Sequence, residues 1–444
     1  HARAGRDNGT SHVAAGGSNV GFASGCGMST TQPLLLDCTR MVARHFSGAM
    51  PTGIDRVADA YRKHFASRAQ AVIQVRGRAQ VIGRAQSERL FALLDAPDGA
   101  LRQRFAALVR GVGAVVQGEE RGTNASAGAL YLNVTHTDFD LQRHIAWVHS
   151  ENLRPVYLLH DLIPIEHPHF TTPHKAARHN GRVRRALEAA SGIIANSRAT
   201  ASAIGAFARA EGLTMPPIIG APLGSPSLPL PPVRAASPHP SFVCVSTIEH
   251  RKNHMLLLDV WQRLVALHGE RAPRLVLIGR WGVGSQAVRQ RYNSDPLLRR
   301  FVTILSGCSD AQVAQHVSAA RALLVPSRAE GFGLPVVEAL KLGVPVIASD
   351  LPVLREVGGT VPTFLCPDAA DEWLRMIQEF VADGAERNRQ IAALPSWSAP
   401  EWRDHFAQVD EWLQTLPARR GRSSAPLQAD NDVTARSALA GRLA

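Results

Sequence analysis

The chain has 444 residues, a length typical of two or three domains with a large buried core. Apolar residues make up 45% of the chain and charged residues 19%, which excludes a disordered or fibrous protein. Lys and Arg exceed Asp and Glu by 12, so the partners to consider are nucleic acid, an acidic membrane surface and phosphorylated substrates. Part of this excess lies in residues 1–27 and 418–444, and charge alone selects none of the three.

The five cysteines are sparse and show neither a Cys-x-x-Cys pair nor a Cys/His spacing that suits zinc. This pattern is typical of reduced thiols, so we expect a cytoplasmic location. No apolar run reaches the ~20 residues that span a bilayer. Residues 1–27 are rich in Gly, Ser and Ala and lack the apolar core of a signal peptide, so we expect them to be a disordered extension.

In the first half of the chain, short β-rich runs alternate with amphipathic stretches, the pattern of βαβ units and a parallel sheet. We expect one Rossmann-like domain over residues 28–220. Its predicted strands are Leu34–Cys38, Ala71–Val75, Ala129–Val134, Val156–His160 and Ile193–Asn196, and its predicted helices include Ile54–Ala66 and Ser87–Leu94. Prolines then become frequent, and because proline continues neither element type, residues 221–240 are predicted to form a linker.

A second α/β block is expected over residues 241–400. Its predicted strands are Phe242–Ser246, Leu275–Gly279, Val302–Ile304, Ala322–Pro326 and Pro345–Ser349, and its predicted helices are Asn253–Leu267, Asp310–Ala319 and Pro335–Leu342. Apolar residues at a spacing of three to four predict a C-terminal helix over 401–417, and we expect a disordered tail over 418–444. The sequence thus predicts an α/β protein in which two Rossmann-like domains face each other across a cleft, the usual place for a ligand.

The most informative segment is the loop between the strand that ends at Pro326 and the helix that begins near Pro335. Glu330 lies on this loop, and Glu338 lies early in the helix between apolar neighbours. The backbone N–H groups just before the helix lie at its positive end, a place suited to phosphate. They belong to Gly331, Phe332, Gly333 and Leu334. Two solvated helix charges are the alternative for the glutamates, and we favour a functional pair.

Arg251 and Lys252 lie where a predicted strand runs into the next helix. Cations are unfavourable at a helix start unless an anion is present, so we prefer a phosphate site there to a surface pair. This segment and the Glu330 loop both follow strands of one predicted sheet. We therefore expect them to converge on one ligand.

These residues carry a resemblance to a known family. Glu330 and Glu338, with Gly-Phe-Gly-Leu-Pro between them, resemble the E-x7-E motif of the retaining GT-B glycosyltransferases of family GT4. The run from Val245 to His254 resembles the phosphate segment of that family. In the first half, residues 133–137 and His160-Asp161-Leu-Ile-Pro resemble the bacterial polysaccharide members. The resemblance implies a GT-B fold whose C-terminal helix returns toward the first domain.

The resemblance implies that Glu338 accepts hydrogen bonds from the donor ribose. Glu330 and the backbone of residues 331–334 would hold the transferred sugar, and His160 would lie near the face of that sugar. Arg251 and Lys252 would stabilise the diphosphate as negative charge develops on the leaving group. Glu330, His160, Arg251 and Lys252 are therefore the expected catalytic residues.

Further donor contacts are implied around the first domain. Gly53 would let its loop approach the diphosphate closely. Asn196 and Ser197, at the end of a predicted strand, resemble the strand end found in the same family. Thr52 and Asp55 are expected to cap the helix that follows them.

The implied reaction moves a hexose from a nucleotide diphosphate sugar to a glycan or lipid-linked acceptor in cell-surface polysaccharide biosynthesis. Mannose from GDP-mannose is one candidate donor. No metal or other cofactor is expected, because Arg251 and Lys252 would take the place of a cation. Contact with the anionic inner face of the plasma membrane would agree with the basic charge.

Other interpretations remain at this level. Another GT-B enzyme, such as a nucleotide-sugar epimerase, would carry similar motifs. Nucleic-acid binding is not expected, because the chain has no aromatic-basic module and only 6% aromatic residues.

Asp138-Phe139-Asp140 imitates a metal-binding D-x-D motif, but we interpret it as structural. Arg182, Arg184 and Arg185 are expected on a solvated helix face, with anionic lipid as the alternative partner.

Overall fold

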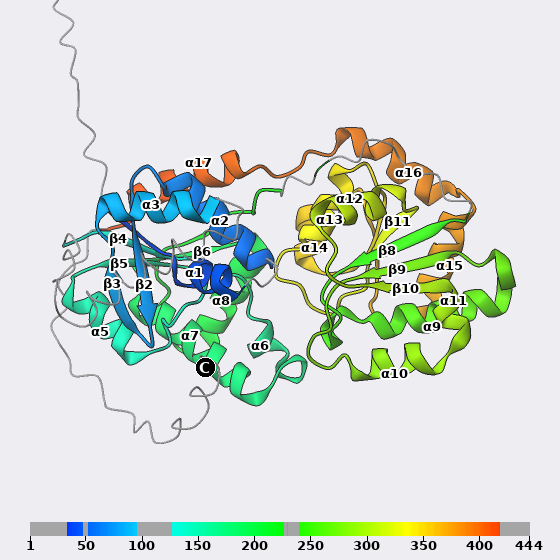
Figure 1. The fold of residues 1–444 in the computed structure, drawn as a ribbon, viewed down its shortest axis with the longest axis horizontal. Helices are drawn as coiled ribbons and strands as arrows, with labels where there is room; N and C mark the ends of the chain where they lie inside the picture. Colours follow the sequence, from blue (N-terminus) through cyan, green and yellow to red (C-terminus); the bar gives the residue numbers. More distant parts are fainter. Residues whose placement is uncertain (1–32, 48–51, 96–126, 226–228, 230–238, 418–444) are drawn as a thin grey trace, which may run out of the picture. The chain divides into compact units, whose positions relative to one another are not determined.

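The structure is a computed structural model that describes residues 33–47, 52–95, 127–225, 229 and 239–417. Strands and helices alternate along the described residues and build two sheets (Figure 1). The expected disordered ends, 1–27 and 418–444, and most of the expected linker lie outside the described residues.

The first sheet has seven strands in the order β3-β2-β1-β4-β5-β6-β7, and only the β2–β3 pair is antiparallel. The strands are β1 (Leu34–Asp37), β2 (Ala69–Val75), β3 (Arg78–Val81), β4 (Leu130–Asn133), β5 (Arg154–Leu159), β6 (Gly192–Ala195) and β7 (Ile218–Gly220). The helices are α1 (Thr39–Ser47), α2 (Gly53–Phe65), α3 (Arg84–Asp95), α5 (Gln142–Ser150), α6 (Ile163–Glu166), the 3-10 helix η1 (Pro168–Phe170), α7 (Pro173–Ala189) and α8 (Arg198–Ala210).

The second sheet is wholly parallel, with six strands in the order β10-β9-β8-β11-β12-β13. The strands are β8 (Ser241–Val245), β9 (Arg274–Ile278), β10 (Val302–Leu305), β11 (Ala322–Val325), β12 (Val346–Ser349) and β13 (Thr363–Leu365). The helices are η2 (His250–Lys252), α9 (His254–His268), η3 (Gly269–Arg271), α10 (Gln286–Ser294), α11 (Pro296–Phe301), α12 (Asp310–Ala319), α13 (Leu334–Lys341), α14 (Pro352–Gly358), α15 (Ala370–Val381), α16 (Ala385–Ala393), η4 (Leu394–Ser396) and α17 (Trp402–Thr415).

The predicted α/β class with two parallel sheets is confirmed, and each of the ten predicted strands overlaps an observed one. The prediction omitted β3, β7 and β13. Strands β7 and β13 have only three residues each, and β3 carries the mostly polar run Arg-Ala-Gln-Val, so none shows a clear apolar pattern.

Buried apolar side chains form the core on both faces of each sheet. Strands β1, β4, β5, β6, β11 and β12 are buried at every residue, as expected for strands of a parallel sheet that helices cover on both sides. One apolar cluster runs through both sheets and includes residues of α2, α13 and α17. A shared core of this kind fixes the contacts that join the two sheets.

The C-terminal helix α17 returns to the first sheet, as predicted. The Tyr61 hydroxyl of α2 shares a hydrogen bond of 2.9 Å with His405 Nε2 of α17, and Arg154 donates one of 2.6 Å to the Leu416 carbonyl. Figure 1 shows α17 beside α2 and α3. No helix in the described part of the chain combines the length and the hydropathy that a membrane crossing requires.

The predicted cap of α2 is confirmed. The Asp55 carboxylate accepts a hydrogen bond of 2.8 Å from the Thr52 backbone N–H, and the two residues form a capping box. Arg40 of α1 donates to the same carboxylate at 2.7 Å. The first turn of α2 is thereby held in place, which matters because this turn carries residues that contact the second sheet.

Candidate active site

The strand order of the second sheet places a ligand site between β8 and β11. The chain direction across the sheet reverses at this point, and open parallel sheets bind ligands there, beyond the carboxyl ends of the strands. Two segments leave the sheet at this edge: η2 follows β8, and residues 326–333 follow β11. The Arg328 backbone N–H donates a hydrogen bond of 2.8 Å to the Arg251 carbonyl, so the two segments form one wall.

Glu330 is held in this wall by three side chains. Its Oε1 accepts hydrogen bonds from Lys252 Nζ at 2.5 Å and from the Ser327 hydroxyl at 2.7 Å, and its Oε2 lies 3.4 Å from Arg251 Nη1. The Glu330 side chain is only 8% exposed and that of Lys252 10%. The structure thus brings together the predicted catalytic residues Glu330, Arg251 and Lys252.

The charges of this cluster balance. Burial alone would raise the pKa of Glu330, but Lys252 and Arg251 lower it to about 2, so its carboxylate is ionised at neutral pH. Arg251 also pairs with Glu249, whose Oε1 lies 2.7 Å from Arg251 Nε. Two carboxylates therefore face two cations. The sequence predicted cations open to phosphate, whereas in this structure their charge is already paired.

The backbone before α13 offers a row of N–H groups. Within the described residues, no acceptor binds the N–H groups of the four residues from Gly331 to Leu334. Gly333 is the N-cap of α13 and has a φ of 101°, a left-handed conformation that glycine adopts without strain. Free N–H groups at a helix start suit an anion, as the sequence predicted for this segment.

Gly333 and Gly343 provide a test of this loop geometry. Both have positive φ, but a Cβ on Gly333 would lie 2.5 Å from Leu354 Cδ2, whereas a Cβ on Gly343 would meet nothing within 4 Å. Gly343→Ala is expected to cost about 1–2 kcal/mol, from its left-handed conformation alone. Gly333→Ala is expected to cost at least about 1 kcal/mol more, from the added clash. Urea unfolding of both variants measures the difference, and equal losses would contradict this geometry.

Glu338 makes its contacts with a residue that the sequence did not single out. Arg56 of α2 donates a hydrogen bond of 2.8 Å to Glu338 Oε1 and one of 2.6 Å to Asp310 Oδ1 of α12. Burial raises the pKa of Glu338 to about 7, with Arg56 opposing and Asp310 reinforcing the rise. The sequence did contain a signal for a role of Arg56 in the site. Arg56 lies three residues after Gly53, in the first turn of a helix that was expected at the site.

Several predicted residues of the first sheet reach this region. A Cβ on Gly331 would lie 2.8 Å from the His160 carbonyl oxygen, and a Cβ on Gly53 would lie 3.4 Å from Leu334 Cδ1. The site is therefore built from the carboxyl ends of both sheets.

His160 is buried and its ring is oriented by the backbone. Its Nε2 lies 2.9 Å from the Val134 carbonyl oxygen, a contact that requires a proton on Nε2. Burial lowers the pKa of His160, so the neutral ring is favoured. Among the described residues, the side-chain hydrogen bond of the His160 ring is made by Nε2, and none is made by Nδ1. A neutral ring of this tautomer presents Nδ1 as a hydrogen-bond acceptor.

Asn196 and Ser197 make contacts within the protein, and their predicted contact with the donor stays a prediction. The Asn196 amide donates a hydrogen bond of 2.8 Å to the His160 carbonyl, and the fully buried Ser197 hydroxyl accepts one of 3.0 Å from the Thr200 N–H as the N-cap of α8. The Ser197 hydroxyl and the Asn196 amide nitrogen are thus used within the protein, whereas the buried Asn196 Oδ1 has no hydrogen-bond partner among the described residues. Asn196 thereby positions the segment around His160, and Ser197 caps α8.

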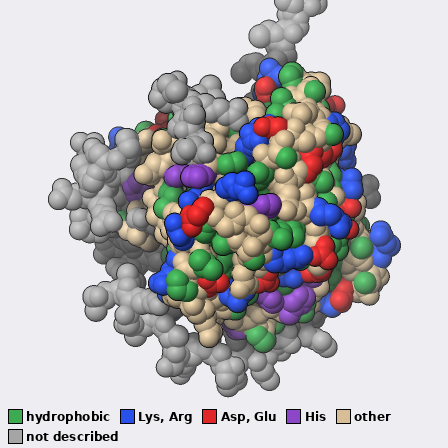
Figure 2. All heavy atoms as spheres, turned by 90° about the vertical axis from the view of Figure 1, so that its right-hand side faces the viewer, with side chains coloured by type: hydrophobic (Ala, Val, Ile, Leu, Met, Phe, Trp, Pro, Cys, Tyr) green, Lys and Arg blue, Asp and Glu red, His purple; other side chains and the backbone are tan. Residues whose placement is uncertain are grey.

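The Asp138-Phe139-Asp140 motif has structural contacts. Asp138 accepts a hydrogen bond from the Gly77 N–H at 2.9 Å, and Asp140 pairs with Arg178 at 2.7 Å and Arg182 at 3.1 Å. The prediction that Arg182 lies on a solvated face is wrong, because its side chain is 19% exposed and contacts Asp140. On the face that Figure 2 shows, Lys and Arg are interspersed with Asp and Glu rather than gathered in one basic patch.

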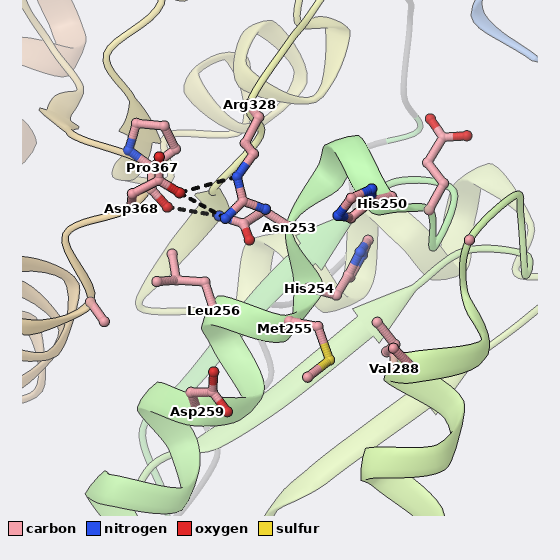
Figure 3. A pocket seen from close by; sticks show the side chains of 14 residues that line it. His250, Asn253, His254, Met255, Leu256, Asp259, Val288, Arg328, Pro367 and Asp368 are labelled. Carbon is pink, nitrogen blue, oxygen red and sulfur yellow. Dashed lines mark hydrogen bonds and ion pairs between the residues drawn. The ribbon is translucent and has the colours of Figure 1, made fainter. Parts of the chain in front are cut away.

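Beside the wall formed by Arg251 and Arg328 lies a pocket of about 420 Å³, which the sequence did not predict. It is bounded by the start of α9, the start of α10 and the segment before α15 (Figure 3). Arg328 and Asp368, joined by a hydrogen bond of 2.7 Å, form one side of it.

Known proteins share parts of this chain. Residues 232–397 match the family model described as "Glycosyl transferases group 1". The serotype-specific mannosyltransferase WbdA of Escherichia coli is 29% identical over 143 residues, which are 32% of this chain and 17% of WbdA. The O-antigen chain mannosyltransferase B of Escherichia coli is 32% identical over 143 residues, 32% of this chain and 37% of that relative. The chain therefore matches well under half the length of either curated relative.

The fold is also shared with solved structures. HepE of Anabaena, crystallised in complex with UDP-glucose, superposes with a TM-score of 0.58 over 86% of this chain and 99% of that chain. At 18% sequence identity, this likeness concerns the fold.

Proposed function

We propose that this chain, whose residues 232–397 match the glycosyl transferases group 1 model and whose fold is shared with HepE, is a retaining glycosyltransferase of the GT-B type. It transfers a hexose from a nucleotide diphosphate sugar to a glycan or lipid-linked acceptor in cell-surface polysaccharide biosynthesis. The mannosyltransferase names of WbdA and of the O-antigen chain mannosyltransferase B support mannose as the sugar, and hence GDP-mannose as the donor.

One observation carries the proposal: Lys252 and Arg251 close on Glu330 next to the free N–H groups of residues 331–334. A diphosphate bound at these N–H groups lies beside both cations. Negative charge grows on the leaving phosphate as the bond to the sugar breaks, and preorganised cations and N–H groups lower the energy of that charge. No metal ion is required for this stabilisation.

In the proposed reaction, the acceptor hydroxyl attacks the anomeric carbon from the same face of the sugar as the leaving phosphate. The acceptor hydroxyl forms a bond to the anomeric carbon as the bond to the phosphate oxygen breaks, and the departing phosphate takes the hydroxyl proton. Configuration is retained because both events occur on one face. Glu330, ionised and held by Lys252, accepts hydrogen bonds from sugar hydroxyls, and His160 Nδ1 accepts one more.

The pKa of Glu338 gives a pH dependence to donor binding. Its carboxyl is neutral below a pKa of about 7 and ionised above it, and the ionised form is the stronger acceptor for ribose hydroxyls. Affinity for the donor is expected to rise about tenfold from pH 6 to pH 8. Calorimetry with an intact nucleotide diphosphate sugar measures this rise, because its phosphates do not titrate in that range. Glu338→Gln should flatten the profile, and a sloping profile in that variant would contradict the assignment.

The proposed function is tested by binding and by product. A panel of nucleoside diphosphates and their sugars should raise the melting temperature, because a ligand that binds the folded state stabilises it. Incubation with donor and acceptor, with EDTA present, should give a glycoside of unchanged anomeric configuration. Release of an epimerised nucleotide sugar without acceptor would support an epimerase instead.

We also propose a cytoplasmic location with peripheral contact at the inner membrane face. Co-sedimentation of the protein with anionic vesicles tests the membrane contact.

A further inference from the structure

The pocket beside the site shares its wall with the proposed catalytic cluster. Arg251 and Glu330 belong to the cluster, while the neighbouring Glu249, His250 and Arg328 line the pocket. The hydrogen bond between the Arg328 N–H and the Arg251 carbonyl joins the two segments of this wall. A molecule in the pocket is therefore separated from the proposed diphosphate site by one layer of chain.

The charges of the pocket disfavour a phosphate. Three of its lining side chains are carboxylates, Glu249, Asp259 and Asp368, and Arg328 is its one permanently charged cation among the described residues. Arg328 is bound to Asp368, and Asp259 has Arg291 no closer than 3.6 Å. Glu249 in turn pairs with Arg251 at 2.7 Å, so each carboxylate of the lining faces a cation and Arg328 is not free for a phosphate, which favours a neutral ligand.

The same lining holds one buried polar atom that the described part of the protein leaves without a hydrogen bond. His254 is 1% exposed, it lines the pocket, and its Nδ1 has no partner among the described residues. A buried polar atom without a partner is costly, and a ligand that supplies one removes that cost. Figure 3 shows His250, His254 and Asp259 among the side chains that line the pocket.

Apolar groups complete the lining. Met255, Ala287 and Val288 contribute apolar surface beside these polar side chains. Carboxylates, an amide and imidazoles next to small apolar groups match a molecule with many hydroxyls and apolar C–H faces, which is a sugar. The volume of about 420 Å³ lies in the lower part of the range of ~300–1,000 Å³ typical of small-molecule pockets.

A segment that follows β5 of the first sheet lies next to the pocket. The segment after His160 runs through α6 to η1, where the Phe170 ring lies 5.3 Å from the His250 ring, centroid to centroid. His250 lines the pocket. The segment that follows His160 thus adjoins the pocket lining at His250, and we expect a longer acceptor whose reacting end lies near His160 to reach the pocket along it.

We propose that this pocket binds a neutral sugar unit of the glycan acceptor, one or more units away from the reacting hydroxyl. This inference rests on the proposed function, since it assumes a glycan acceptor. It predicts that longer acceptors bind more tightly than a single sugar, because they fill a second site.

Binding can be tested without turnover. Saturation-transfer NMR on the full chain, with GDP or UDP in excess to fill the donor site, uses methyl α-mannoside, α-mannobiose and maltose as probes, with mannose 1-phosphate as the anionic comparison. A neutral probe is expected to bind the wild type and to bind Asp259→Asn about 5- to 10-fold more weakly. Ala287→Trp, which fills the pocket from an exposed position, should weaken binding more than Asp259→Asn does and should remove the affinity gain of α-mannobiose over methyl α-mannoside. Glu270→Gln, an exposed carboxylate variant outside the pocket, should leave it unchanged.

Each result decides the inference. No binding to the wild type, equal binding to Ala287→Trp, or tighter binding of mannose 1-phosphate than of the neutral sugars would overturn it. Stabilisation by a nucleoside diphosphate is measured on the same samples. If that stabilisation is present and sugar binding is absent, the pocket inference fails and the proposed function stands; if stabilisation is absent, the proposed function fails.

Discussion

Lys252→Met is expected to lower kcat for sugar transfer by about 10²–10³-fold, the loss typical when one group that stabilises a developing negative charge is removed. The substitution keeps most of the side-chain volume and removes the charge that lies 2.5 Å from Glu330. Transfer of radiolabelled sugar measures the effect. Lys63→Met is the matched control, because Lys63 is 60% exposed in a surface pair and should change neither activity nor stability appreciably.

The same substitution separates stability from catalysis. Glu330 would be left buried with the Ser327 hydroxyl and Arg251 as its remaining partners, which is expected to cost about 3 kcal/mol of unfolding free energy. Adding Glu330→Gln removes the unpaired charge, so the double variant should regain much of that stability and none of the activity. Full turnover in folded Lys252→Met would contradict the role given to this cation.

Glu338→Gln is expected to raise the donor KM by about 10²-fold or more. Two ribose hydroxyls lose a charged acceptor, at about 1.5–3 kcal/mol for each hydrogen bond, and every 1.4 kcal/mol is a factor of ten. Arg56 would keep Asp310 as a partner, so the fold should hold. Initial rates over a range of donor concentrations give KM and kcat separately.

Arg56 provides the companion test. Arg56→Ala removes the group that lowers the pKa of Glu338, so donor affinity should fall at pH 7 and recover at higher pH. Glu372→Gln, an exposed variant on α15, is the control for both substitutions. A donor KM within about twofold of the wild type in Glu338→Gln would exclude a ribose contact, because such a change is worth less than one hydrogen bond.

The parts of the fold that sequence could predict are those with local causes. Strands buried on both faces form apolar runs, so β1, β5 and β11 were found from composition alone. Glycine and proline bound the Glu330 loop in the sequence, and the structure has a left-handed Gly333 and α13 there. The cap of α2 followed from Thr52 and Asp55, three residues apart.

The parts that failed depend on residues far apart in the chain. Arg56 and Glu338 are separated by 282 positions, and only the packing of both sheets makes them partners. The pairing of Arg251 and Lys252 with Glu330 likewise cancels charges that the sequence showed as free. The use of Ser197 as the N-cap of α8 was not predicted, although it was a local pattern available in the sequence.

The central claim is that one nucleotide bridges the Lys252 cluster and Glu338. A crystal structure with a bound nucleoside diphosphate tests it most directly. The account predicts ribose hydroxyls within hydrogen-bond distance of the Glu338 carboxylate and phosphate oxygens at the N–H groups of residues 331–334, beside Lys252 Nζ. A nucleotide bound elsewhere, or one whose phosphates point away from Arg251 and Lys252, would contradict it.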